Sequence, residues 1–186
     1  LDARRKLVLS ADLAFGVNIK EEDIPCVGIS SITAADIARA KEEGLTYKLI
    51  ARAEKSGNAV AAFVCPTLFP SAAPEAHTDG TGNLATLYAV RFGRQSFSGA
   101  GAGGYPTGSS VLRDCLDIAD GCRSFYADSF VPRPVNLSGM QGKWLFRCMG
   151  ETFVRECSAR EAFDAYDSYR KDDPHALLAR YAAEEE

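Results

Sequence analysis

A glycine-rich stretch near the middle of the chain has the composition of a site that receives an anion or a cofactor. Four glycines occupy six consecutive positions, at Gly99, Gly101, Gly103 and Gly104. Glycine lets the backbone take positive φ angles and approach a ligand without a Cβ in the way. Pro106 then favours a first helical turn, and a helix start directs amide N–H groups and a partial positive charge toward one point. A plain loop is the alternative interpretation.

The same stretch fits the spacing G-x-G-x-x-G through Gly99, Gly101 and Gly104, but it does not predict a dinucleotide-binding domain. That fingerprint belongs to the first βαβ unit of a larger fold. Only about eighty residues follow Gly104, and the next candidate strand, over 124–128, is short. The remaining chain is therefore too short to build such a domain.

A second pair of chemically capable residues lies at the start of the chain. Asp2 and Lys6 are four positions apart, so on a helix their side chains meet on one face. From this spacing alone the pair predicts a solvated ion pair worth a few tenths of a kcal/mol. The helix is expected over 2–16, where Gly16 ends an amphipathic run. Its apolar side comprises Leu7, Val8, Ala11, Ala14 and Phe15.

The composition is that of a globular protein. Hydrophobic residues make up 46% and charged residues 25% of the 186 positions, which are ordinary globular values. The net charge of −4 argues against nucleic acid or an anionic membrane as the main partner. The longest apolar run, 59–65, is far shorter than the roughly 20 residues of a spanning helix. Six scattered cysteines and only two histidines argue against a metal site and favour the reduced thiols of a cytoplasmic protein.

Between the two candidate sites the sequence predicts one helix and several strands. The pattern Thr33-x-x-Asp36 favours a helix start, and Gly44 follows its end. Strands are expected over 45–53, 59–65, 84–92 and 95–98, with a loop over 66–79. Such strands between helices predict an α+β fold, in which a mixed or antiparallel sheet carries helices packed on one face.

The last third of the chain has a different character. The segment Val131-Pro-Arg-Pro134 predicts an extended linker, and residues 143–148 predict a further strand. Apolar positions from Ala159 to Tyr181 predict a helix that Pro174 divides. We therefore expect one domain over residues 1–130 and a C-terminal extension over 131–186, made of linker, strand and helix.

Taken together, three patches of this sequence resemble the catalytic domain of homoserine dehydrogenase. They are Asp2-Ala-Arg-Arg-Lys-Leu7 with Leu13-Ala-Phe-Gly16, the segment from Glu22 to Thr33, and the stretch from Gly99 to Thr107 with Val111 and Asp114. The patches follow one another in the family's order over residues 1–120, and they are specific as a set. The resemblance implies an α+β fold like the C-terminal domain of glyceraldehyde-3-phosphate dehydrogenase.

The resemblance also implies a reaction. Enzymes of this family interconvert L-homoserine and L-aspartate-4-semialdehyde, with a hydride passing to or from NAD or NADP. Lys6 matches the family's proposed acid/base for the hydroxyl oxygen, and burial in a dry pocket would favour its neutral, proton-accepting form. Asp2 matches the residue that binds the substrate amino group, through a charge-assisted hydrogen bond. Gly103, with Gly101 beside it, matches the glycine that contacts the cofactor.

The family's nucleotide-binding domain would precede Leu1, so the cofactor would be bound mainly there and this piece alone is expected to be inactive. A role in threonine and methionine biosynthesis is implied as well. Two alternatives remain open, namely a related dehydrogenase for another small amino or hydroxy acid and a non-catalytic dimerisation module. By the same resemblance, the residue that distinguishes NAD from NADP would lie in that nucleotide-binding domain.

Apolar residues are abundant in two predicted strands, over 59–64 and 84–90. Their number exceeds what one face of a small sheet needs. We therefore expect the free face of the sheet to pair with a second copy of the chain in a homodimer.

Overall fold

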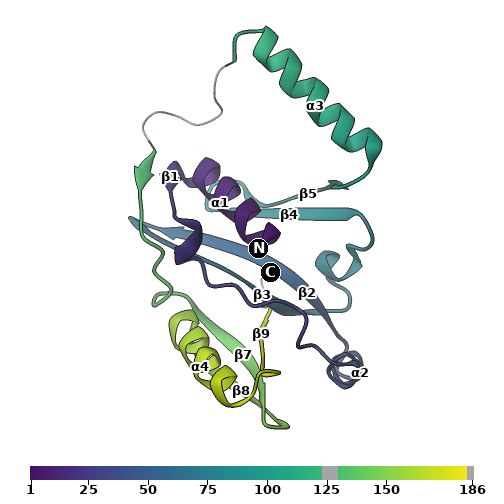
Figure 1. Cartoon of the computed structure of the whole chain (residues 1–186), viewed down its shortest axis with the longest axis vertical. Coiled ribbons are helices and arrows are strands. Elements are labelled where there is room, and N and C mark those ends of the chain that lie inside the picture. The colour runs from purple at the N-terminus through teal and green to yellow at the C-terminus, as the bar shows by residue number, and fades with distance from the viewer. Residues whose placement is uncertain (123–129, 184–186) are drawn as a thin grey trace. The chain divides into compact units, whose positions relative to one another are not determined.

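The computed structural model describes residues 1–122 and 130–183 (Figure 1). The chain forms two compact units, one of residues 1–71 with 126–186 and the other of residues 72–125. We call the first the sheet unit and the second the hairpin unit. The strand predicted over 124–128 lies outside the described residues. No helix in the described ranges is both long enough and apolar enough to cross a membrane.

The sheet unit is built on a five-stranded mixed sheet. In spatial order its strands are β2 (Leu45–Ser56), β3 (Ala59–Pro70), β9 (Leu177–Tyr181), β7 (Gln141–Cys148) and β8 (Glu151–Ser158). β3 and β9 run parallel, and the other neighbouring strands run antiparallel. The predicted α+β class with a mixed sheet is confirmed.

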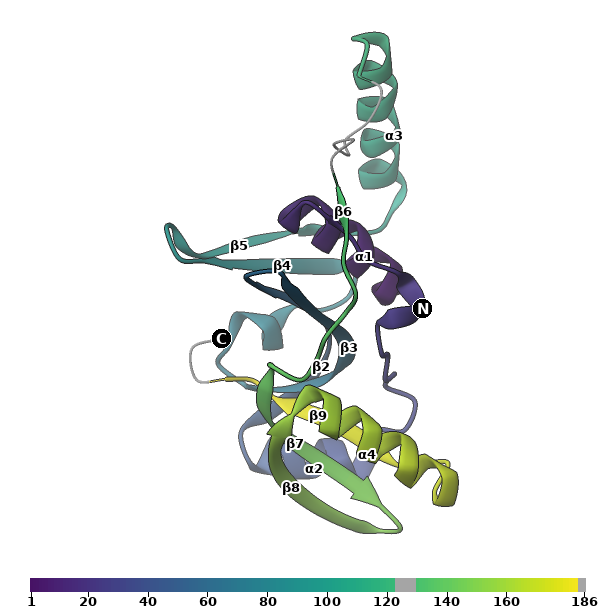
Figure 2. The ribbon, with the colours of Figure 1, turned by 90° about the vertical axis from the view of Figure 1, so that its left-hand side faces the viewer.

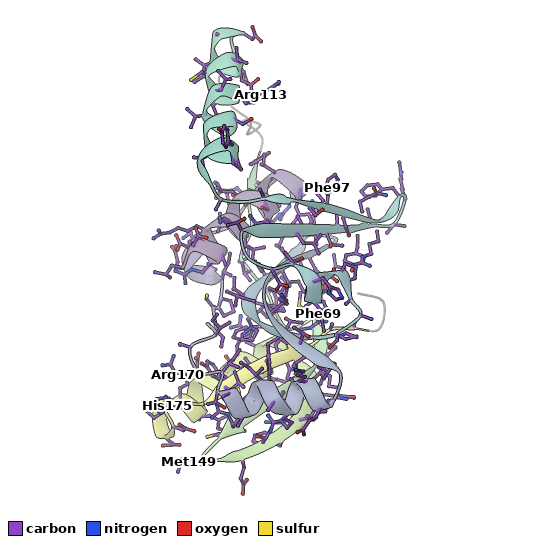
Figure 3. The ribbon with its side chains drawn as sticks, turned by 90° about the vertical axis from the view of Figure 1, so that its right-hand side faces the viewer. Phe69, Phe97, Arg113, Met149, Arg170 and His175 are labelled. Atoms are coloured by element: carbon purple, nitrogen blue, oxygen red, sulfur yellow. The ribbon has the colours of Figure 1, made fainter. Side chains whose placement is uncertain are left out.

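Three helices cover this sheet, and they lie on both of its faces. They are α1 (Asp2–Phe15), α2 (Ala34–Glu42) and α4 (Ala159–Asp172). Figure 2 shows α4 in front of β7 and β9 with α2 behind them, and Figure 3 shows α2 in front from the opposite side. The prediction that the helices pack on one face is therefore corrected.

The reason lies in β3, which is apolar at consecutive positions. Val60 and Val64 pack with Leu7 of α1, whereas the intervening Phe63 packs with Phe163 of α4. Alternate side chains of a strand point to opposite faces, so β3 is buried on both. A strand of this kind needs a helix on each side, and the C-terminal segment supplies the second one.

The centre of the larger core is an aromatic cluster between β3, β7 and α4. Trp144 is fully buried, and its ring centroid lies 5.6 Å from that of Phe63 and 5.9 Å from that of Phe163. The Trp144 indole N–H donates a hydrogen bond to the backbone oxygen of Cys157 at 3.1 Å. The cluster therefore joins three elements through packing and one directed hydrogen bond.

The C-terminal helix ends earlier than its apolar pattern predicts. α4 stops at Asp172, and residues 177–181 form the strand β9 rather than more helix. Leu177, Leu178 and Ala179 are all buried because β9 is the central strand of the sheet. A strand buried on both faces gives a continuous apolar run, which periodicity does not separate from a helix.

The domain boundary expected at residue 130 stays a prediction. Strands β7, β8 and β9, which follow it, share one sheet with β2 and β3, which precede it.

Other strand limits also differ from expectation. Pairing between β2 and β3 continues from Leu49–Pro66 to Leu45–Pro70, so the loop predicted over 66–79 begins only after residue 70. A 3-10 turn, η2 (Pro74–His77), follows. Strand β8 has no counterpart among the predicted elements. Part of the predicted linker forms β6 (Val131–Pro132), which pairs in parallel with β1 (Val17–Asn18), and η1 (Glu21–Asp23) follows β1.

The start of α2 is tied to β7 through a buried carboxylate. The Thr33 hydroxyl accepts a hydrogen bond from the Asp36 N–H, and the Asp36 carboxylate accepts one from the Thr33 N–H, which completes a capping box. Arg147 Nε lies 3.1 Å from Asp36 Oδ1, and Arg147 Nη2 donates to the Ser31 backbone oxygen at 2.6 Å. The Asp36 side chain is only 3% exposed. Burial would by itself raise the pKa of Asp36, but the hydrogen bonds from Thr33 and the Arg147 guanidinium outweigh it and lower the pKa.

Acid is therefore expected to remove the stabilisation that Asp36 provides. The unfolded chain has an aspartate pKa of about 3.9, and the folded pKa is lower, so the contribution is complete above about pH 4 and is lost as pH falls through the folded pKa. Urea unfolding of the wild type and of Asp36→Asn at several pH values between 7 and 3 measures it. The difference in unfolding free energy should shrink as pH falls. A difference that does not change with pH would contradict this.

The described part of the hairpin unit contains a two-stranded sheet and one α-helix. β4 (Gly82–Ala89) and β5 (Gly93–Ala100) form an antiparallel hairpin, and α3 (Gly104–Ala119) follows. The predicted pair of strands and the following helix are therefore present, but these strands form their own two-stranded sheet. Arg94 Nη2 lies 2.7 Å from Glu75 Oε1, which ties the hairpin to η2.

Candidate functional site

The helix α1 brings the first predicted pair of site residues together. Lys6 Nζ lies 2.9 Å from Asp2 Oδ2, as the four-residue spacing predicts. The Lys6 side chain is 66% exposed and the Asp2 side chain 82% exposed. An exposed ion pair of this kind contributes about 0.3–0.5 kcal/mol. The ion pair therefore contributes little to the stability of the protein. The role of Asp2 in substrate binding and that of Lys6 in catalysis stay predictions.

The rest of α1 forms a fixed support for this pair. Leu7 and Ala11 are buried in the core against β3. At the other end of the helix, Gly16 is left-handed at φ 63° and donates its N–H to the Asp12 backbone oxygen. The Asp12 side chain accepts a hydrogen bond from the Ile19 N–H at 3.0 Å. Burial raises the pKa of Asp12, and the Ile19 hydrogen bond partly opposes that rise.

The neighbouring cations of α1 have a different partner. Glu21 Oε1 lies 3.0 Å from Arg4 Nη2 and 3.3 Å from Arg5 Nε. The hydrogen bond from Arg4 is the main cause that lowers the pKa of Glu21. Glu21 therefore forms ion pairs with both arginines, whereas Asp2 forms its ion pair with Lys6.

The glycine-rich stretch leads from the end of β5 to the start of α3. The Gly101 N–H donates a hydrogen bond to the Thr81 backbone oxygen at 2.8 Å. Gly103 has φ 120° and ψ 159° and is the residue that precedes α3, and the Thr107 N–H donates to its oxygen. Of the four glycines, Gly103 is the one with the positive φ that side chains resist. No side chain in the described residues caps the start of α3, so this end of the helix keeps free amide groups.

A residue that the sequence analysis missed, Asn83, lies against this stretch. A Cβ placed on Gly101 would occupy the same space as the Asn83 side-chain amide. Asn83 lies opposite Gly99 in the register of the hairpin. No local sequence pattern identifies Asn83, because only the register of the two strands places it beside the glycines.

Apolar side chains of the helix α3 are exposed. The exposed fractions range from 52% to 71% for Val111, Leu112, Leu116 and Ile118. The predicted pair Asp2 and Lys6 belongs to the sheet unit, whereas the glycine-rich stretch and α3 belong to the hairpin unit.

Two cavities lie in the sheet unit, away from the predicted residues. One, of about 380 Å³, is lined by acidic side chains of η1 and α4 together with Arg160. The other, of about 310 Å³, is lined by Cys26, two serines, Arg170 and His175, the last two of which are labelled in Figure 3. In the described part of the chain no group of three or more His, Cys, Asp or Glu residues is placed to hold a metal ion. All six cysteines are free thiols.

The mixed sheet with helices on both faces is an α+β fold like that of the C-terminal domain of glyceraldehyde-3-phosphate dehydrogenase. Residues 1–116 match the protein-family model for homoserine dehydrogenase. The match covers more than half of the chain, so the chain belongs to the homoserine dehydrogenase family.

Curated relatives and solved structures agree with this assignment. Homoserine dehydrogenase from Corynebacterium glutamicum is 42% identical over 123 residues, which cover 63% of this chain and 28% of that protein. The Bacillus subtilis enzyme is 37% identical over 66% of this chain and 28% of its own length. This chain thus spans little more than a quarter of the relatives it matches. A homoserine dehydrogenase structure from Thiobacillus denitrificans has a TM-score of 0.77 at 22% identity, covering 97% of this chain and 52% of that one, so it shares the fold.

Proposed function

We propose that the whole protein to which this chain belongs is an oxidoreductase that interconverts L-homoserine and L-aspartate-4-semialdehyde with a nicotinamide cofactor. Membership of the family supports the proposal. The observation that carries it is the pair of Asp2 and Lys6, held 2.9 Å apart on the exposed side of a well-anchored helix. Both charged groups are open to a ligand, and they differ in the role each can take.

In this proposal Lys6 moves the proton. When hydride leaves the carbon of homoserine, the O–H bond must also break, and the oxygen gives its proton to the neutral amine of Lys6. In the reverse direction the Lys6 ammonium returns that proton to the oxygen as hydride arrives. The nicotinamide cofactor supplies the hydride acceptor or donor when it is bound.

Asp2 has the complementary role of holding the substrate amino group. A carboxylate and an ammonium form a charge-assisted hydrogen bond, so the substrate ammonium can take the place beside Asp2 that Lys6 now occupies. The exchange leaves Lys6 next to a like charge and without its own carboxylate partner.

We further propose that Gly103 and Gly101 lie against the cofactor, which is NAD or NADP. The positive φ of Gly103 and the uncapped start of α3 fit a close approach of backbone to an anionic ligand. An N-terminal nucleotide-binding domain of the whole protein would hold most of the cofactor. This chain by itself would then be inactive.

The remaining proposals concern the setting of the enzyme. Residues 1–130 form the catalytic module and 131–186 its C-terminal extension. The protein acts in the cytoplasm, in the biosynthesis of threonine and methionine from aspartate. The free thiols of the described cysteines agree with a reducing compartment.

A homodimer is also proposed, but the structure changes which surface would form it. The apolar residues of 59–64 are used by helices on both faces of the five-stranded sheet. Apolar side chains of the hairpin remain exposed, namely Leu87, Tyr88, Phe92 and Phe97. Because a two-stranded hairpin is marginal by itself, we expect a second copy to cover it. Light scattering of the whole protein at micromolar concentration should give a dimer mass, and a monomer would contradict this.

Substrate profiling of the whole protein tests the proposed function. The value of kcat/KM with NAD or NADP should be highest for L-homoserine among small amino and hydroxy acids. A preference for another acid would indicate a related dehydrogenase. Absence of any dehydrogenase activity from the intact protein would leave the dimerisation module as the better description.

A further inference from the structure

We infer that Asn83 is a positioning residue for the glycine-rich stretch. Its side-chain amide packs on the backbone of Gly101 and fixes the path of the chain from β5 to Gly103. This inference rests on the proposed function, in which the stretch lies against the nicotinamide cofactor. It also explains why position 101 requires glycine without reference to the cofactor, because the Asn83 amide occupies the space of a Cβ there.

The hairpin register accounts for the contact. Asn83 of β4 pairs with Gly99 of β5, and the next hydrogen bond along joins the Gly101 N–H to the Thr81 oxygen at 2.8 Å. Pairing therefore continues past the end of β5 and holds Gly101 diagonally across from Asn83, where side chains still reach one another. The amide fills the space that a Cβ on Gly101 would take.

The other three glycines have different surroundings. A Cβ on Gly99 or on Gly104 would meet no atom within 4 Å, and neither residue has a positive φ. A Cβ on Gly103 would have an ordinary contact, 3.6 Å from Pro106 Cδ, so the positive φ is what requires glycine there. Within this stretch, Gly101 is thus the glycine whose Cβ a neighbouring side chain excludes.

The contact predicts how substitutions combine. Asn83 is exposed and its amide can rotate about the side-chain bonds, so a methyl group at position 101 would push the amide aside without unfolding the hairpin. Gly101→Ala and Asn83→Ala then remove one and the same contact. Two substitutions that remove one contact have effects that do not add.

The functional consequence falls on cofactor binding. Without the amide, the backbone between Gly101 and Gly103 samples more conformations, and binding must order it again. We expect the KM for the nicotinamide cofactor to rise about tenfold, a typical size for one lost contact. Since Asn83 does not touch the reacting atoms in this proposal, kcat at saturating cofactor should stay within about twofold.

Kinetics of the whole enzyme test this with four variants, Asn83→Ala, Gly101→Ala, the double variant and the control Gln95→Ala. The first three should raise the KM for cofactor to a similar extent. Gln95→Ala should leave it within about twofold, because Gln95 is an exposed amide side chain of β5 that lies opposite Leu87, outside the glycine-rich stretch. A double variant whose KM is the product of the two single effects would overturn the inference. A rise with Gly101→Ala but none with Asn83→Ala would overturn it as well.

Melting temperatures of the same four proteins keep this inference separate from the proposed function. If the protein lacks homoserine dehydrogenase activity, the proposed function fails, yet the contact remains measurable. The shifts in melting temperature for Asn83→Ala and Gly101→Ala should then fail to add in the double variant. Shifts that add would show that the two residues do not interact, whatever the activity.

Discussion

Replacing Lys6 by alanine in the whole enzyme is expected to lower kcat for homoserine oxidation by about 10²–10⁴-fold, the usual contribution of a positioned acid/base. The side chain is 66% exposed and makes an ion pair worth little to stability, so folding should be nearly unchanged. The loss would therefore report the missing proton acceptor. Steady-state rates with saturating homoserine and cofactor measure it, and circular dichroism checks the fold.

A neighbouring arginine provides the matched control. The Arg5 side chain has the same exposed fraction as Lys6, 66%, but contacts Glu21. Arg5→Ala should leave kcat within about threefold, because a change of exposed charge alone has a small effect at moderate ionic strength. Asp2→Ala should instead raise the KM for homoserine, since this carboxylate is proposed to hold the substrate ammonium. Near-normal turnover in Lys6→Ala would show that another group moves the proton.

Local signals in the sequence predicted several elements correctly. The spacing of apolar residues before Gly16 predicts α1, and the pattern from Thr33 to Asp36 predicts the capping box that begins α2. The strands expected over 45–53 and 59–65 likewise correspond to the hairpin of β2 and β3. In each case the deciding interaction joins residues close together in the sequence, so the pattern contains the information.

Features that depend on distant residues were not predictable in this way. The run from Leu177 to Ala179 is a strand because β3 and β7 flank it, and nothing within the run distinguishes a buried strand from a buried helix. The same partners place α4 on the second face of the sheet. Arg147, which pairs with Asp36 across 111 positions, was likewise invisible to any local pattern.

The glycine-rich stretch shows an intermediate case. Its composition identified it as a candidate site, and the positive φ of Gly103 agrees with that prediction. Composition did not reveal that Gly101 and Gly103 require glycine for different reasons. The requirement at Gly101 comes from Asn83 on another strand, so it became visible only with the register of the hairpin.

Replacing Trp144 by alanine is expected to lower the unfolding free energy of the protein by about 3–5 kcal/mol, the usual cost of removing a large core aromatic. Trp144 is fully buried between Phe63 and Phe163, and its indole N–H satisfies the Cys157 oxygen. The substitution leaves a cavity among these rings and removes that hydrogen bond. Because domains are stable by only about 5–15 kcal/mol, much of the stability of the sheet unit should be lost.

Urea unfolding followed by circular dichroism measures this change, since Trp144 is the single tryptophan of the chain and fluorescence would lose its probe. Val154→Ala is the control, because Val154 lies on β8 of the same sheet but is 44% exposed. That substitution should cost about 1 kcal/mol or less. A loss below about 1 kcal/mol in Trp144→Ala would mean that the aromatic cluster does not hold α4 against the sheet. A large loss confined to Trp144→Ala would support the cluster as the interaction that joins the C-terminal segment to β3. Because α1 packs on β3 as well, the cluster would then also support the helix that bears Asp2 and Lys6.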